Sequence, residues 1–238
     1  MYLTRIILSP SAYRARTLLS SAHRLHAGLA ASFPAHGTTN PAQDTSARLL
    51  WRVDTPTSRA DPVLYVVSPH GPDMAEAQER IVDASQIATK DYTPLLDGLT
   101  AGDVFSFRLT ANPTSHQLRE SAVPQTTGGR HPDRVRKPLC NHADRVAWLQ
   151  RKLTDAGARV SPVRVGDGTV PDVVVDGEMR DSFHRRGGAR KAGGEVTIHR
   201  VNFVGRLTVT DPGAFRTALV AGVGPAKGYG CGLLTVVR

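Results

Sequence analysis

The sequence predicts an α+β protein made of two ferredoxin-like units in tandem, each with the order β-α-β-β-α-β. Short apolar strands and amphipathic helices follow that order over residues 1–113. Residues 114–141 then change to a polar, proline-containing and basic composition that is typical of a linker or surface loop. Residues 142–238 fit a second, degenerate copy of the same unit. A chain of 238 residues is long enough for two such domains, each with its own core.

The first unit contains six predicted elements. They are a strand at 1–8, a helix in the second half of 13–33, strands at 49–53 and 63–67, a helix at 73–82 and a strand at 104–109. The first helix is predicted by an apolar stripe of Ala22, Leu25, Leu29 and Phe33. The second begins after Asp73, a residue type that caps helix N-termini well.

The second unit is less regular. A helix at 143–156 carries Val146, Leu149 and Leu153 on its inner face. Strands at 172–175, 196–204 and 206–209, a helix at 211–221 and a strand at 233–237 follow it. Asp211 and Pro212 together are typical of the first residues of a helix.

The composition restricts the compartment and the partner. Two cysteines, Cys140 and Cys231, form no disulfide framework, and no apolar run approaches the length of a membrane span, so we expect a cytoplasmic protein. The pair Cys140 and His142 lacks the full ligand set of a zinc site, and we expect no metal and no small-molecule cofactor. The net charge of +9 favours nucleic acid over a membrane as partner, although a solvated basic surface is the simpler alternative.

A glycine-rich segment near the C-terminus, residues 222–232, is the strongest local signal. Its dense glycines allow backbone N–H groups to approach a phosphate closely, and a lysine and a tyrosine stand among them. It fits neither a P-loop nor a dinucleotide-binding fingerprint, because a helix precedes it and a strand follows it. We predict that this glycine loop grips an RNA backbone, with a packing turn as the alternative. The candidate residues are Gly222, Gly224, Lys227, Gly228, Tyr229 and Gly230.

Two histidines lie three residues apart on the first predicted helix, so His23 and His26 project from one face. Imidazoles titrate near neutral pH, which suits acid–base cleavage of RNA without a metal. On spacing alone, a surface pair of histidines is the simpler interpretation. Arg24 between them is a candidate phosphate ligand.

A basic segment around residues 180–191 has two glycines at its centre and strand-like flanks. A basic hairpin of this kind could enter the groove of an RNA stem, while a mobile charged tip is the alternative. The candidates in this segment are Arg185, Arg186, Arg190 and Lys191, with weaker ones at Arg130, Arg134, Arg136 and Lys137.

Several motifs resemble, in order along the whole chain, those of the CasE family of CRISPR precursor-RNA endoribonucleases. The glycine loop, from Gly222 to Val236, resembles the C-terminal motif of that family. The other matching segments are 1–10, the helix with His26 that ends at Phe33-Pro34, 107–113, 145–149 and 205–212.

The resemblance implies two tandem RNA-recognition-motif-like domains and a metal-independent endoribonuclease. Such an enzyme cuts at the base of the repeat hairpin by attack of a ribose 2′-hydroxyl, leaves a cyclic phosphate and a 5′-hydroxyl, and retains its product in the Cascade complex with other subunits. It also implies that His26 is catalytic, in a Tyr-x-x-His pattern whose tyrosine position is His23 here. Because of this departure, a non-catalytic subunit that binds the RNA hairpin is the main alternative, and a basic RNA-binding module outside CRISPR is a further one.

Overall fold

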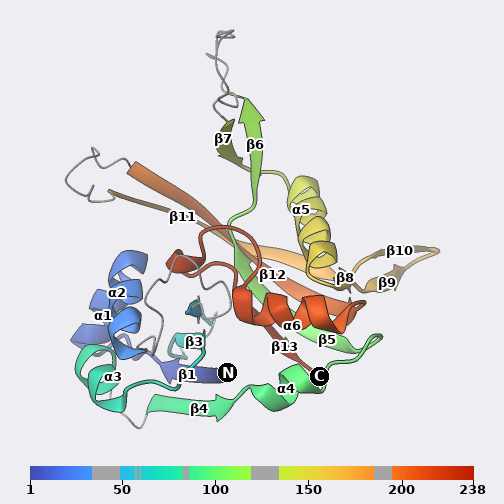
Figure 1. Cartoon of the computed structure of the whole chain (residues 1–238). Helices are drawn as coiled ribbons and strands as arrows, with labels where there is room; N and C mark the ends of the chain where they lie inside the picture. The colour runs from blue at the N-terminus through green and yellow to red at the C-terminus, as the bar shows by residue number, and fades with distance from the viewer. Residues whose placement is uncertain (34–48, 57, 59, 83–85, 119–133, 185–194) are drawn as a thin grey trace, which may run out of the picture.

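A computed structural model describes residues 1–33, 49–56, 58, 60–82, 86–118, 134–184 and 195–238 (Figure 1). The described chain forms two sheets of antiparallel strands with helices packed on them, and smaller two-stranded ribbons at the periphery. The α+β class predicted from the sequence is confirmed. In the described part of the chain, no helix combines the length and the apolar character that a membrane crossing requires.

The first sheet has the strand order β2-β3-β1-β4, and each strand is antiparallel to its neighbours. Its strands are β1 (Tyr2–Ile7), β2 (Leu50–Asp54), β3 (Val63–Ser68) and β4 (Ile87–Asp91). Helices α1 (Tyr13–Leu19), α2 (Ala22–Ser32) and α3 (Met74–Arg80) belong to the same unit. Leu25 and Leu29 of α2 pack with Ile6 and Trp51 in a core of this unit. The Asp73 side chain caps α3 by accepting from the N–H groups of Ala75 and Glu76.

The second sheet repeats this topology. Its order is β11-β12-β5-β13, which corresponds to the second, third, first and fourth strands of the unit. The unit consists of β5 (Val104–Ala111), α5 (His142–Asp155), β11 (Val173–His184), β12 (Glu195–Val209), α6 (Pro212–Ala221) and β13 (Leu234–Val237). The short β8 (Ala158–Val160) also pairs with β12, and β9 (Pro162–Val165) pairs with β10 (Gly168–Pro171). Asp211 caps α6, as expected, by accepting from the N–H of Ala214.

The strand predicted to close the first unit instead begins the second. β5 pairs with β12 and β13, while β4 is the fourth strand of the first sheet. The expected boundary after residue 113 therefore falls earlier, near α4 (Thr93–Asp97), which joins the two sheets. Sequence periodicity missed β4 because it is an edge strand with four of its five residues exposed, so it has no buried face to produce an apolar pattern.

Three further expectations differ in detail. The first half of residues 13–33 is helical as well, with a break between α1 and α2 at Ser20 and Ser21. The segment expected to be a basic loop at 114–141 contains a paired ribbon, β6 (Thr114–Leu118) with β7 (Arg134–Pro138), which projects from the body in Figure 1. The two strands predicted at 196–204 and 206–209 form one strand of 15 residues, β12.

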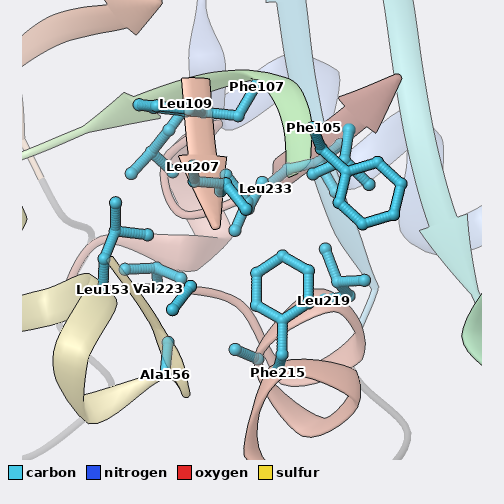
Figure 2. Packing of buried hydrophobic residues seen from close by; sticks show 14 of the residues in the cluster. Phe105, Phe107, Leu109, Leu153, Ala156, Leu207, Phe215, Leu219, Val223 and Leu233 are labelled. Atoms are coloured by element: carbon cyan, nitrogen blue, oxygen red, sulfur yellow. The ribbon is translucent and has the colours of Figure 1, made fainter. Parts of the chain in front are cut away.

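The main core lies between the second sheet and helices α5 and α6 (Figure 2). Phe105, Phe107 and Leu109 are buried at alternate positions of β5 and belong to the same core cluster as Phe215 and Leu219 of α6 (Figure 2). This core also includes Leu50 and Val67 of the first sheet, so the two units share apolar contacts.

Arg52 adds a polar link between the sheets. It is almost fully buried, and its Nη1 donates to the carbonyls of Arg108 (2.8 Å) and Leu233 (3.1 Å). Asp54 on the same strand neutralises the guanidinium at 2.6 Å. A buried cation that is neutralised and hydrogen-bonded in this way fixes the first sheet against β5 and the end of the glycine loop.

Candidate active site

Helix α2 positions the two candidate histidines. The Ser21 side chain caps the helix by accepting from the N–H of Arg24 at 3.4 Å, and Leu25 and Leu29 anchor the opposite face in the core. His23 and Arg24 are exposed, whereas His26 is half-buried. The face that carries both imidazoles is thus directed away from the core but is not fully open to water.

His26 has the electrostatics of a neutral imidazole. Burial lowers its pKa below the usual value, and the nearby His23 lowers the pKa further. Its Nδ1 atom is buried and has no hydrogen-bond partner among the residues that the structure describes. A half-buried imidazole without a carboxylate partner in that part of the chain remains uncharged at neutral pH, with a lone pair available to accept a proton.

The glycine loop runs from the end of α6 to β13 and closes on itself. The N–H of Val223 donates to the carbonyl of Gly232 (2.8 Å), whose own N–H donates to Thr110 of β5 (2.7 Å). Lys227 donates from Nζ to the carbonyl of Ala221 at 2.7 Å, across the mouth of the loop. Ala226 has the left-handed φ of 63° and precedes a single 3₁₀ turn, η2 (Lys227–Tyr229). These bonds define a compact loop rather than an extended tail.

The loop of the second unit reaches the helix of the first. A Cβ placed on Gly228 would lie 3.9 Å from both Cε1 and Nε2 of His26, so the backbone there borders the imidazole. Gly230 lies against the ring of Trp51 in β2, and Gly222 lies against Leu50. The structure therefore brings together His26 and the glycine loop, two features that lie at opposite ends of the sequence.

The other sequence candidates separate into two groups. Lys227 and Tyr229 are half-buried, and Lys227 bonds to the loop itself, so at least part of its role is to hold the loop closed. Strands β11 and β12 pair as far as His184 and Glu195, which agrees with the predicted flanks of a hairpin. The four basic candidates at its centre, Arg185, Arg186, Arg190 and Lys191, lie outside the described residues.

Sequence reasoning missed Trp51 as a residue of this region. It is buried, and it touches the loop through Gly230. Nothing in the local pattern of β2 distinguishes this tryptophan from an ordinary core residue. The contact joins positions far apart in the chain, and only the arrangement of the two sheets reveals it.

The fold and the site together define a class: α+β proteins with two ferredoxin-like units, in which a glycine loop of the second unit closes on a histidine-bearing helix of the first. A family model described as CRISPR associated protein matches residues 1–238. The Cascade subunit CasE of Escherichia coli K12 is 30% identical over 99% of this chain and 98% of its own length. The CRISPR-associated endoribonuclease Cse3 of Thermus thermophilus is 29% identical over 99% of both chains.

Solved structures agree with these relatives. A structure of CRISPR endoribonuclease Cse3 bound to a 19-nucleotide RNA matches with a TM-score of 0.74 and 29% identity, covering both chains completely. The crystal structure of Cas6e from E. coli K-12 matches with a TM-score of 0.60 and 27% identity, again over both full chains. The chain belongs to the CasE family of CRISPR-associated proteins.

Proposed function

We propose that this chain is an endoribonuclease that cuts CRISPR precursor RNA at the repeat hairpin without a metal ion. The observation that supports it best is the placement of His26, a half-buried imidazole with a lowered pKa beside a glycine loop. Similarity over the full length to an endoribonuclease of T. thermophilus supports the same reaction class.

In the proposed reaction the ribose 2′-hydroxyl attacks the adjacent phosphorus. A 2′-O–P bond forms while the P–O5′ bond breaks, which leaves a 2′,3′-cyclic phosphate and a 5′-hydroxyl. His26, uncharged because of its low pKa, accepts the 2′-hydroxyl proton. His23, one helical turn away on the same face and exposed, donates a proton to the leaving 5′-oxygen when it is in its charged form.

The RNA stem is held, in this proposal, by charges and backbone on both sides of the histidines. Arg24 is exposed on α2 and contacts a phosphate near the scissile bond. Arg185, Arg186, Arg190 and Lys191, which lie in the sequence between β11 and β12, neutralise phosphates along the stem. The N–H groups of the glycine loop contact the RNA backbone at the cut.

We also propose that the protein retains the cut hairpin within a Cascade complex in the cytoplasm. Similarity over nearly the whole length to a protein named as a Cascade subunit supports this assembly. An enzyme that holds its product gives at most one cut per molecule, so its action is measured under single-turnover conditions.

The test is incubation of the purified chain with its own repeat hairpin RNA in the presence of EDTA. A single cut that leaves a cyclic phosphate, and that is lost in His26→Ala while the hairpin still binds, supports both the nuclease and its independence of metal. Cutting that requires an added divalent ion would refute the mechanism. Failure to bind the hairpin would refute the CRISPR substrate.

One observation favours a second candidate, a non-catalytic subunit that binds the hairpin. His23 stands where relatives are expected to carry a tyrosine that assists the reaction. Tight binding by the wild type with no cut, and a cut that is gained in His23→Tyr, would select this second function. A measurable cut by the wild type, at a rate equal to or above that of His23→Tyr, excludes it.

A further inference from the structure

We infer that Trp51 and Gly230 form a joint that seats the glycine loop against His26, and that both are positioning residues for the cleavage reaction. The inference rests on the proposed function and deepens it. Neither residue needs to touch the RNA. They fix the distance between an imidazole of the first unit and a backbone segment of the second.

Close approach at this joint requires a glycine. A Cβ on Gly230 would lie 2.6 Å from Cζ3 and 2.9 Å from Cη2 of Trp51, which is far inside van der Waals contact. Gly230 also has a left-handed φ of 78°. Trp51 is itself buried among residues of the first core, so its ring has little room to retreat.

Two further contacts hold the loop on both sides. Gly222 lies against Leu50, the neighbour of Trp51 in β2, with 2.8 Å between its virtual Cβ and Cδ2. Gly224 lies against the ring of Trp148 in α5, with 2.9 Å between its virtual Cβ and Cη2 of the indole. Glycines of the loop thus contact large side chains from both units. Because of these contacts, the loop cannot move as a whole to relieve a collision at Gly230.

The 3₁₀ turn just before the joint carries the effect to His26. Gly228 is two residues before Gly230, and its backbone borders Cε1 and Nε2 of the imidazole. The loop covers an edge of the ring and so contributes to the burial that lowers the pKa of His26. If Gly230 is pushed off Trp51, Gly228 moves, and both the hydration of the ring and the space beside Nε2 change.

The effect on the reaction follows from geometry. A misplacement of about 1 Å between a catalytic group and its substrate can reduce a rate about 10²-fold. We expect Gly230→Ala to reduce the single-turnover cutting rate by about that factor. Affinity for the hairpin should change little, because phosphate contacts are spread over the whole protein surface that faces the RNA.

Gly102 provides a matched control. It has a similar left-handed φ of 92°, but a Cβ there would meet nothing within 4 Å. Gly102→Ala therefore imposes the same kind of backbone strain without any collision. A compensating variant completes the set: Trp51→Phe removes the part of the indole ring that carries Cζ3 and Cη2.

The experiment measures the single-turnover cutting rate, the hairpin affinity and, by NMR titration, the pKa of His26. It compares four full-length proteins: wild type, Gly230→Ala, Gly102→Ala and the double variant Gly230→Ala with Trp51→Phe. The inference predicts a slow Gly230→Ala protein whose His26 pKa moves up toward the ordinary value. It also predicts an unaffected Gly102→Ala and a partly recovered rate in the double variant. Circular dichroism confirms that each variant is folded.

Three results would overturn the inference. One is a Gly230→Ala protein with the rate and the His26 pKa of the wild type. The second is a rate loss that weaker hairpin binding fully explains, and the third is an equal rate loss in Gly102→Ala. The NMR titration needs no RNA, so it tests the joint even if the wild type cuts nothing. Failure of the proposed function is thereby distinguished from failure of the joint.

Discussion

Helices α2 and α5 follow the first strand of two sheets that share one strand order, yet their buried polar side chains differ in whether they have bonding partners. In α5, Arg145 is buried, pairs with Glu178 of β11 at 2.8 Å and donates from Nε to the carbonyl of Leu139 at 2.9 Å. In α2, His26 is half-buried, and its Nδ1 has no bonding partner in the described part of the chain.

The two helices differ in whether a buried polar side chain gains a partner of opposite charge. The Arg145 guanidinium is compensated from its own sheet, and it holds the pKa of Glu178 below its usual range, chiefly through their hydrogen bond. His26 is desolvated by burial beside the charge of His23 and gains no described carboxylate, so its pKa falls instead. Under the proposed function, this fold position serves stability in α5 and proton transfer in α2, depending on whether a partner of opposite charge is supplied.

The strongest test of this contrast removes a histidine from each helix. Under the proposed function, His26→Ala should lower the single-turnover rate by roughly 10²–10⁴-fold, the range for loss of a general acid or base. His142→Ala, at the exposed first residue of α5, should leave the rate unchanged. The measurement is cutting of the repeat hairpin with enzyme in excess, together with hairpin affinity. An equal loss of cutting rate in His26→Ala and His142→Ala would show that α2 has no special part in the reaction.

The reverse prediction concerns stability. Arg145→Ala removes a buried side chain that satisfies both a carboxylate and a backbone carbonyl, so we expect a loss of ~2 kcal/mol in the free energy of unfolding. Urea denaturation measures it. The cutting rate of the folded fraction should stay close to that of wild type, since Arg145 bonds within the second unit and not to α2. A rate loss larger than the stability loss explains would show that α5 takes part in the reaction.

The sequence predicts those helices and strands whose signal lies within their own residues. Helices α3 and α6 were found from an aspartate that caps each one, and β1, β2, β3 and β13 from their apolar patterns. Strand β4 was missed because an exposed edge carries no such pattern, and the boundary between the units shifted with it.

The candidate site was predictable in its residues and not in its assembly. The glycine loop stands out by its own residue types, whereas His26 is singled out over a surface histidine pair only by the resemblance to the CasE family. Their contact, and the part of Trp51 in it, depend on how the two sheets pack through Arg52 and the shared core, which no local pattern encodes. The lowered pKa of His26 follows from that assembly and could not be inferred from spacing.

A smaller effect distinguishes α3 from α6, the helices that precede the fourth strand of each sheet. Asp73 caps α3 and Asp211 caps α6, so either aspartate replaced by alanine should cost ~1 kcal/mol of stability. α6 leads directly into the glycine loop, whereas α3 does not. We therefore expect Asp211→Ala to slow cutting as well, and Asp73→Ala to affect thermal unfolding alone. Matching cutting rates in the two variants would show that the loop keeps its position without the cap of α6.

The smallest expected effect isolates the two causes of the His26 pKa. Burial is the larger and the charge of His23 the smaller, so His23→Ala should raise the His26 pKa partway and leave it below the ordinary value of 6.5. NMR titration of the free protein measures this, and a full return to the ordinary value would mean that burial contributes little.

The same shift has a consequence for stability. Because the folded-state pKa is lower than that of the unfolded chain, the unfolded chain binds the proton first as the pH falls. His26 therefore reduces the free energy of unfolding as the pH decreases from the ordinary histidine value through the folded-state value. His23→Ala narrows the pH interval between the two pKa values of His26, so the free energy of unfolding that is lost at acid pH should be slightly smaller. Urea denaturation of both proteins above and below pH 6.5 checks the sign, and a larger acid loss in His23→Ala would contradict it.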